Sequence, residues 1–311
     1  MKYIRTIGEL PKNIDTIITA FSGWSDAGDA ATGSVKYIVK ERDAKLIANF
    51  EPEDFYDFTQ NRPLVSVNGS GIRNLTWPEN NFYLAPGNTE KSPLLLFTGT
   101  EPNLKWNSFS NAFLDVVELC NVKEIITLGS LLNAVPHTRR PKVNGSSSSI
   151  KIRKIMDQLQ MVNGGSYEGP TGIGSVIIQS AVERGLEHSG FWGHVPHYIQ
   201  TAPNPIVIES ILDSLKRVFG ISIDLKKLQG QSAAFIERCE EAVKEDPSIE
   251  EYVTRLEKYF DDVIDNEDIP FLENREPSSN GINTSITDFP NPEDLLEDLE
   301  DFLRNKRDTE Q

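Results

Sequence analysis

The sequence predicts an α/β protein with a three-layer α/β/α body and a helical C-terminal extension. Short apolar runs, typical of buried strands, alternate with amphipathic helical patterns in the first half, and helical patterns dominate the second half. Three of the strand-like runs end in glycine-marked loops that lead into helical patterns, as in open α/β sheets. We expect the body at residues 1–230, a helical extension of the same domain at 231–262 and an acidic tail at 263–311.

The first half supplies six expected strands and two expected helices. Residues 94–97 are apolar throughout, which suits a strand buried on both faces of its sheet. Residues 52–62 are aromatic and acidic and precede Pro63, so we expect irregular structure there. The expected strands are residues 14–20, 44–50, 64–67, 81–84, 94–97 and 124–128, and the expected helices are residues 29–40 and 108–119.

The second half is mainly helical. Residues 141–149, with four consecutive serines, are typical of a mobile loop. Asn204 and Pro205 fit the cap and first turn of a helix that Gly220 ends. The expected elements are helices at residues 152–159, 172–185, 205–219, 235–243 and 249–260, and a strand or strand–loop at 190–198.

The charge balance excludes one class of partner and singles out the tail. The chain has 31 basic and 47 acidic residues, a net charge of −16. Non-specific nucleic-acid binding needs clustered Lys and Arg, so we expect no nucleic-acid partner. Residues 263–311 contain 14 acidic and 4 basic residues and therefore carry −10 of this charge. The acidity is mostly a property of the tail.

The tail divides into two parts. Residues 263–290 are polar and acidic and lack apolar periodicity, so we expect disorder there. Residues 292–304 predict a short amphipathic helix with Leu295, Leu299 and Phe302 on one side. A helix of this length is marginal alone. It docks either on its own body or on a partner, and the sequence leaves both open.

The remaining composition indicates a cytoplasmic protein. The first residues lack the apolar region of a signal peptide. No apolar run approaches the ~20 residues that span a bilayer, so we expect no membrane association. Cys120 and Cys239 lie in helical patterns and suit buried free thiols in a reducing compartment.

Candidate functional residues concentrate in the loops at 21–28, 99–102 and 129–140, because the carboxyl ends of parallel strands meet at one edge of a sheet. A glycine-rich segment and a Pro-His segment in the second half join them. The candidate pocket or interface residues are Gly23, Trp24, Asp26, Gly28, Glu101, Pro102, His137, Arg139, Gly169, Thr171, Gly172 and His197.

These loops carry no complete catalytic or metal-binding signature. His194 and His197 are close in sequence, but no carboxylate or cysteine at ligand spacing completes a metal set. A Gly-x-Ser-x-Gly elbow, a Walker loop and a Gly-x-Gly-x-x-Gly motif are all missing from the sequence. We therefore assign no catalytic residue, no metal and no cofactor. Asp26 or Asp29 is expected to cap the following helix.

Three polar groups leave alternatives open. His137 has the chemistry of a general base, but hydrogen bonding to backbone or to a neighbouring subunit is the more common role of a loop histidine. Glu101 and the pair Arg139-Arg140 suit either a polar ligand or salt bridges across a subunit boundary, and we favour the boundary.

A set of short segments in the order of the chain carries a family resemblance. They are Gly23-Trp24-Ser25-Asp26-Ala27-Gly28, Phe55-Tyr56-Asp57-Phe58 with Arg62-Pro63, Glu101-Pro102, Leu128-Gly129-Ser130-Leu131-Leu132, Val135-Pro136-His137-Thr138-Arg139, Gly169-Pro170-Thr171-Gly172-Ile173, Pro196-His197-Tyr198 and Pro203-Asn204-Pro205. Over about residues 15–260 the sequence resembles the proteasome assembly chaperone family in its prokaryotic form.

The resemblance implies a three-layer fold like that of nucleoside phosphorylases and related hydrolases, self-association into small homo-oligomers, and a role in handling other proteins. It brings no catalytic residues. Some chaperones of this group end in a hydrophobic-Tyr-x tail that enters pockets on the proteasome α-ring. This sequence ends in Thr309-Glu310-Gln311, so we do not expect docking by that route.

The sequence thus predicts a non-enzymatic, oligomeric protein-interaction factor. Its expected partners are further copies of itself and proteasome subunits or another protein. The alternative is a nucleosidase-like or other small-molecule hydrolase or transferase. Such an enzyme would use a pocket at the carboxyl ends of the strands, with His137, Glu101 and Arg139 as its polar groups. This alternative rests on fold analogy alone.

Overall fold

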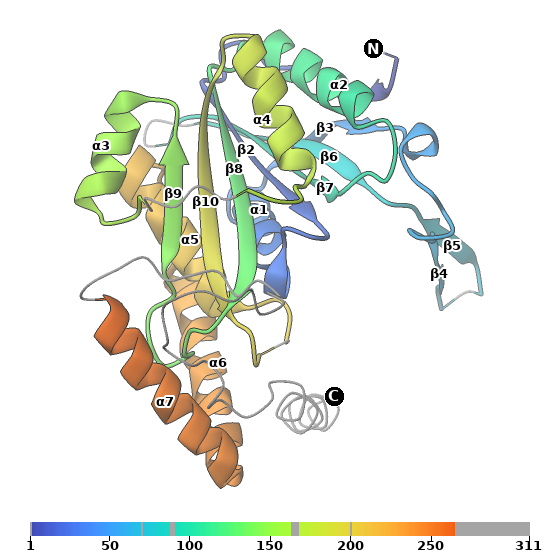
Figure 1. The fold of residues 1–311 in the computed structure, drawn as a ribbon. Helices are drawn as coiled ribbons and strands as arrows, with labels where there is room; N and C mark the ends of the chain where they lie inside the picture. The colour runs from blue at the N-terminus through green and yellow to red at the C-terminus, as the bar shows by residue number, and fades with distance from the viewer. Residues whose placement is uncertain (1, 70, 88–90, 163–167, 200, 265–311) are drawn as a thin grey trace.

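The computed structural model describes the chain except residues 1, 70, 88–90, 163–167, 200 and 265–311. It contains a mixed eight-stranded sheet in the order β1-β3-β6-β7-β2-β8-β10-β9 (Figure 1). The strands are β1 (Ile4–Thr6), β2 (Thr16–Ser22), β3 (Lys45–Phe50), β6 (Asn80–Ala85), β7 (Leu94–Thr100), β8 (Glu124–Asn133), β9 (Val143–Ser147) and β10 (Glu187–Pro196). The central strands β7, β2, β8 and β10 are parallel, and β6 and β9 flank them in antiparallel pairing.

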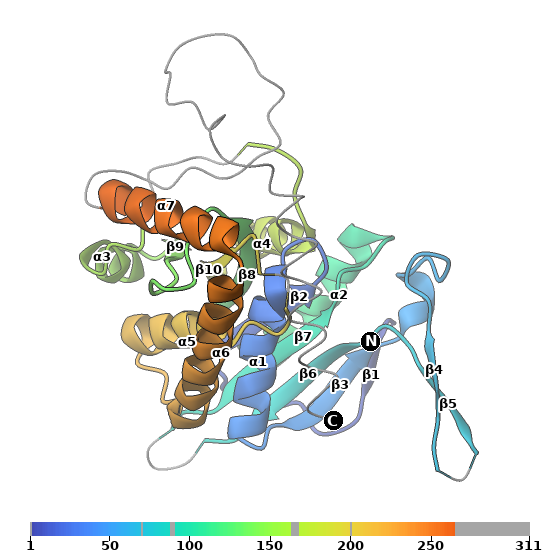
Figure 2. The same cartoon turned by 90° about the horizontal axis from the view of Figure 1, so that it is seen from below.

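Helices cover both faces of this sheet, because its central strands are apolar on both sides. Helices α1 (Ala30–Glu41), α3 (Ile150–Gln158) and α5 (Pro205–Phe219) share one core cluster with one set of strand residues. Helices α2 (Trp106–Leu119) and α4 (Ile173–Glu183) share a second cluster with the alternate residues of the strands. Figure 2 shows α1 and α5 on one side of the sheet and α2 and α4 on the other. The predicted three-layer α/β fold is confirmed.

The helical extension consists of α6 (Lys226–Glu245) and α7 (Pro247–Ile264). Their apolar faces form a separate cluster in which Phe235, Tyr252 and Leu256 pack against Tyr198 and Ile206 of the body. The cluster lies beyond the carboxyl end of the sheet, below β10 in Figure 1. The two helices therefore cover the loops that follow β8 and β10.

A two-stranded hairpin, β4 (Leu64–Val67) and β5 (Arg73–Thr76), projects away from the body (Figures 1 and 2). Every residue of both strands is exposed. At its turn, the Ile72 N–H donates to Asn68 Oδ1 over 3.0 Å. At its base, the rings of Phe58 and Trp77 meet edge to face with centroids 4.9 Å apart.

Most predicted elements are found within a few residues of their expected bounds, and five differ. Helix α6 begins at Lys226, well before the expected start at 235, and β8 continues to Asn133, so residues 129–133 of the expected loop are strand. Residues 141–149 are not a loop, because β9 pairs with β10 along its whole length. The sequence analysis expected no strand at β5, whose partner is β4, or at β1, which pairs with β3. The cap of α5 is as predicted: Asn204 Oδ1 accepts from the Val207 N–H, and Gly220 ends the helix with φ +67°.

Two further observations concern the expected compartment and tail. Cys120 and Cys239 are both buried free thiols. None of the helices in the described ranges combines the length and apolar character needed to cross a membrane. The expected tail helix at 292–304 lies outside the described residues.

Candidate functional site

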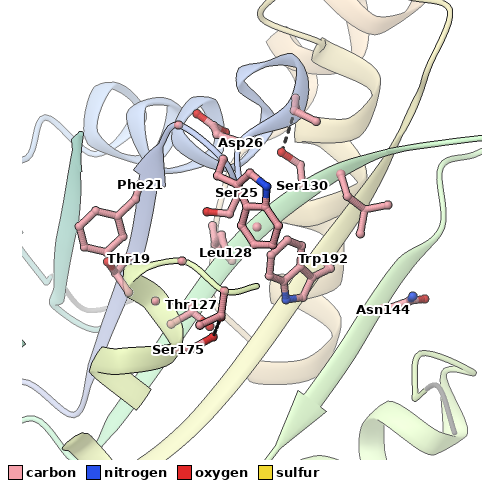
Figure 3. A pocket seen from close by; sticks show the side chains of 18 of the residues that line it. Thr19, Phe21, Ser25, Asp26, Thr127, Leu128, Ser130, Asn144, Ser175 and Trp192 are labelled. Atoms are coloured by element: carbon pink, nitrogen blue, oxygen red, sulfur yellow. Dashed lines mark hydrogen bonds between the residues drawn. The ribbon is translucent and has the colours of Figure 1, made fainter. Parts of the chain in front are cut away.

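The predicted meeting of the three glycine-marked loops is confirmed by the sheet order. Strands β7, β2 and β8 are parallel neighbours, so the loops at 21–28, 99–102 and 129–140 begin at one edge. Beside this edge, on the face that carries α2 and α4, lies a pocket of about 900 Å³ (Figure 3). Its volume is in the range of small-molecule sites.

The pocket exists because α4 leaves part of the sheet uncovered. Its floor comes from β8, β10 and β9, where Trp192 pairs with Gly129 on one side and with Asn144 on the other. The loop after β2 forms one wall, and the N-terminal half of α4 forms another. Among the candidate residues, the pocket is lined by Gly23, Trp24, Asp26, Gly28, Thr171 and Gly172.

One carboxylate and two glycines determine the conformation of the loop after β2, which forms a wall of the pocket. Asp26 is 6% exposed, and its Oδ1 accepts from the Ala31 N–H at 2.8 Å and the Thr32 N–H at 3.0 Å. It therefore caps α1, as predicted. Burial raises the pKa of Asp26, while the hydrogen bonds from Thr32 oppose that rise. Gly28 has φ +57°, and Gly23 has φ +124°, both in the region that favours glycine.

Glu101 joins the loop after β7 to the start of α4. Its Oε1 accepts from the Ile173 N–H at 2.8 Å, where the helix dipole favours a negative charge. A Cβ on Gly172 would lie 2.7 Å from that same oxygen, so a larger residue at this position would displace the Glu101 carboxylate. Glu101 holds the helix that forms the pocket wall.

The neighbouring Pro102 is buried, and its carbonyl accepts from Trp106 Nε1 at 2.6 Å. Gly169 is exposed.

His137 and His197 lie outside the pocket, under α7. His137 Nδ1 is 2.7 Å from Tyr198 Oη, which also accepts from the His137 N–H at 2.8 Å. His197 lies between the carbonyl of Asn133, 3.1 Å from Nδ1, and Tyr252 Oη of α7, 2.7 Å from Nε2. Burial lowers the pKa of His137 to about 4, against an opposing effect of the Glu257 charge.

Arg139 and Arg140 form salt bridges within the chain, whereas we expected them at a subunit boundary. Arg139 Nε and NH2 each donate to a carboxylate oxygen of Asp261, at 2.9 and 2.8 Å, and NH1 lies 3.3 Å from Glu257 Oε1. Arg140 pairs with Asp213 of α5. Arg139, and His197 through Tyr252, fasten α7 to the loops that follow β8 and β10, while His137 joins those two loops to each other through Tyr198.

Three of the pocket residues that the sequence did not indicate are Trp192, Asn144 and Thr19. Trp192 was read as one aromatic of a strand, and Asn144 fell in the segment predicted as a loop. Thr19 lies inside an apolar strand and is 1% exposed. Pairing of β9 with β10, a long-range contact, is what brings Asn144 into the pocket. The described residues contain no group of three or more His, Cys, Asp or Glu placed to hold a metal ion.

The fold and the site define a three-layer α/β/α protein with a pocket at the carboxyl ends of its parallel strands. A model of the PAC2 family matches residues 20–243, and the chain belongs to this family. The match confirms the resemblance to proteasome assembly chaperones and ends within α6, before α7.

Solved structures of this fold include proteins from several organisms. A PAC2 family protein from Streptomyces avermitilis is 33% identical to this chain, with a TM-score of 0.69. The match covers 77% of this chain and 99% of that chain. A proteasome-assembly chaperone homologue from Mycobacterium tuberculosis is 32% identical, with a TM-score of 0.69 and coverage of 76% and 99%. An archaeal proteasome activator from Pyrococcus furiosus shares the fold at 19% identity and a TM-score of 0.59, with 78% and 99% covered. No curated protein matches the chain.

Proposed function

We propose that this protein is a non-enzymatic, cytoplasmic protein-interaction factor that self-associates and acts on other proteins, with proteasome subunits as the expected partners. Family membership supports the chaperone-like role, since a 32% identical relative is a proteasome-assembly chaperone homologue. The observation that carries the interaction function is the exposed apolar hairpin β4–β5.

The hairpin exposes more apolar surface than its size can stabilise alone. Leu64 is 70% exposed, Val65 62%, Val67 61%, and Ile72 and Leu75 59% each. A single two-stranded hairpin is marginally stable in water, and clustered exposed apolar side chains mark interaction sites. Covering a Leu or Val side chain contributes about 1.5–3 kcal/mol, so a partner surface would stabilise the hairpin strongly.

Charge favours another copy of this chain as that partner. Residues 62–78 contain two arginines and neither Asp nor Glu, whereas the whole chain has a net charge of −16. The hairpin is therefore a cationic, apolar arm on an anionic molecule. Such an arm is attracted to the surface of a second copy.

The pocket does not favour the enzyme alternative. Asp26 is the one titratable side chain among its lining residues apart from hydroxyls, and three donors of α1 engage it. Glu101 caps α4, and His137 and Arg139 lie with α7. General acid–base catalysis needs a proton-transfer group within hydrogen-bond reach of the substrate. This pocket is better suited to holding a ligand than to converting it.

The mass of the protein in solution tests self-association. Wild-type protein is expected to elute as an oligomer of the 34.8 kDa chain, measured by light scattering after size exclusion. Val65→Asp with Leu75→Asp, which lie opposite each other on one face of the hairpin, should give the monomer. Leu119→Asp is the matched control, because Leu119 is 52% exposed at the end of α2. A monomeric wild type, or a double variant that keeps the oligomer mass, would contradict the proposal.

A further inference from the structure

On the part of the sheet that α4 leaves uncovered, small and polar residues lie next to the aromatic side chain of Trp192. Register places Gly129, Trp192 and Asn144 side by side on β8, β10 and β9. A Cβ on Gly129 would lie 2.8–2.9 Å from three atoms of the Trp192 ring, so the indole packs directly on this glycine. The ring is partly exposed and lines the pocket (Figure 3). It offers a flat surface on which a second ring can stack.

Two buried polar atoms of the pocket have no hydrogen-bond partner among the described residues. They are Thr19 Oγ1, on a residue that is 1% exposed, and Asn144 Oδ1, on a residue that is 8% exposed. Buried polar groups without partners are rare in folded proteins and costly, so each calls for an explanation.

Two other pocket hydroxyls are engaged within the protein. Ser130 Oγ donates to the Ala27 carbonyl at 2.8 Å, and Thr127 Oγ1 lies 3.4 Å from the Ser189 carbonyl. The buried polar atoms of the pocket that lack a partner in the described structure are therefore those of Thr19 and Asn144, which stand on opposite sides of it in Figure 3. A ligand that bridges them would satisfy both.

The spacing of these groups sets the size of that ligand. Strands β2 and β9 are three strand spacings apart, about 14 Å in total, with Trp192 on the strand next to β9. One small ring cannot reach both polar atoms. A ring stacked on Trp192 and extended by a polar substituent can do so, and a volume of about 900 Å³ accommodates it.

The charged groups of the pocket lining determine which ligand charge the pocket can accommodate. None of the lining residues is Lys, Arg or His, so a phosphate or carboxylate would find no cation. The carboxylate of Asp26 accepts from the backbone and side chain of Thr32 and is not free to pair with a cationic ligand. The pocket thus favours a neutral molecule over either charged class.

We propose that this pocket binds a neutral, planar heterocycle of nucleoside size, stacked on Trp192 and hydrogen-bonded to Asn144 Oδ1 and Thr19 Oγ1. The proposal concerns binding only, and no bond is made or broken. It is independent of the hairpin, because β4 and β5 do not line the pocket and lie on the opposite side of the molecule from β9 and β10 in Figure 1. Loss of self-association would therefore leave it standing.

The test titrates the full chain with adenosine, guanosine, cytidine and uridine and with the matching monophosphates. Binding is measured by calorimetry and by quenching of tryptophan fluorescence. At least one nucleoside is expected to bind saturably and at least tenfold more tightly than its monophosphate. Asn144→Leu and Thr19→Val should each weaken that binding about fivefold to tenfold, the loss of one hydrogen bond. Trp192→Leu should abolish it.

Thr19→Val hardly changes the size of the side chain. This variant therefore still tests the proposal if a variant with a larger change fails to fold. Thr98→Val is the matched control, because Thr98 pairs with Ala20 and therefore lies on the opposite face of the sheet. It should bind as the wild type does. The proposal is overturned if no nucleoside saturates the protein at millimolar concentration, if a monophosphate binds as tightly as its nucleoside, or if Thr19→Val and Asn144→Leu leave affinity unchanged.

Discussion

Two groups of residues at the same end of the sheet have opposite roles. The loop after β8 carries His137 and Arg139, whose chemistry suggests catalysis, yet His137 bonds to Tyr198 in the loop after β10 and Arg139 to Asp261 of α7. The pocket beside that loop is lined mainly by glycine, hydroxyl and aromatic residues, whose types suggest only tight turns and packing. The comparison teaches that reactive residue types mark a site only when they face open space.

The first prediction compares a Leu→Ala substitution in α7 with a Leu→Ala substitution in the pocket. Leu256→Ala in α7 should lower the free energy of unfolding by about 3 kcal/mol, because Leu256 is 1% exposed and its loss leaves a cavity. Leu132→Ala in the pocket should change it by less than about 0.5 kcal/mol, because Leu132 is 46% exposed. Denaturant unfolding measures both. Equal losses would break the distinction between the two groups.

The second prediction concerns pH. Burial lowers the pKa of His137 to about 4, against about 6.5 in the unfolded chain, so the folded state disfavours its protonation. The stability that this group contributes is full above pH 6.5 and is lost as pH falls toward 4, in total on the order of 3 kcal/mol. The difference in unfolding free energy between wild type and His137→Gln should shrink across that window. A constant difference from pH 7 to pH 4 would contradict the assignment.

The third prediction tests how the loops under α7 are held together. Tyr198→Phe removes the oxygen that accepts from the His137 N–H and contacts its Nδ1, and leaves both buried groups unpaired. The expected loss is about 2 kcal/mol of unfolding free energy. Tyr259→Phe on α7 is the control, since Tyr259 is 37% exposed. A loss no larger than that of the control would mean that the His137–Tyr198 contact does not hold these two loops together.

The fourth prediction has the smallest effect and compares two threonines that are each 1% exposed. Thr19→Val should leave the ligand-free protein unchanged or up to about 1 kcal/mol more stable, because its Oγ1 has no partner in the described structure. Thr32→Val should destabilise it by about 2 kcal/mol, because Thr32 Oγ1 donates to the charged Asp26. Thermal unfolding measures both variants. If Thr19→Val and Thr32→Val lowered the stability equally, Thr19 would already be paired within the chain.

Local patterns predicted the layers of the fold but not its edges. The apolar run of β7 and the capped helix α5 are set by neighbouring residues and were found as expected. Strand β9 contains no long apolar run, since Asn144, Gly145 and Ser146 form much of it, and only pairing with β10 makes it a strand. Strand β5 depends on β4 in the same way.

The site was predictable in position but not in composition. Parallel order brought the loops after β2 and β8 together, so Trp24, Asp26 and Gly28 were placed correctly beside the pocket. Sequence spacing could not separate His137 from them, because its hydrogen-bond partner Tyr198 lies 61 residues further along the chain. The role of Trp192 likewise depends on a glycine on another strand.

The central claim is that this protein acts on proteasome subunits, and purification from its native host tests it most directly. Tagged protein expressed at its natural level should enrich proteasome subunits over an untagged control, as quantified by mass spectrometry. Added purified subunits should then bind the isolated protein in a concentration-dependent manner. If proteasome subunits are not enriched and do not bind when supplied, the proposed function is contradicted.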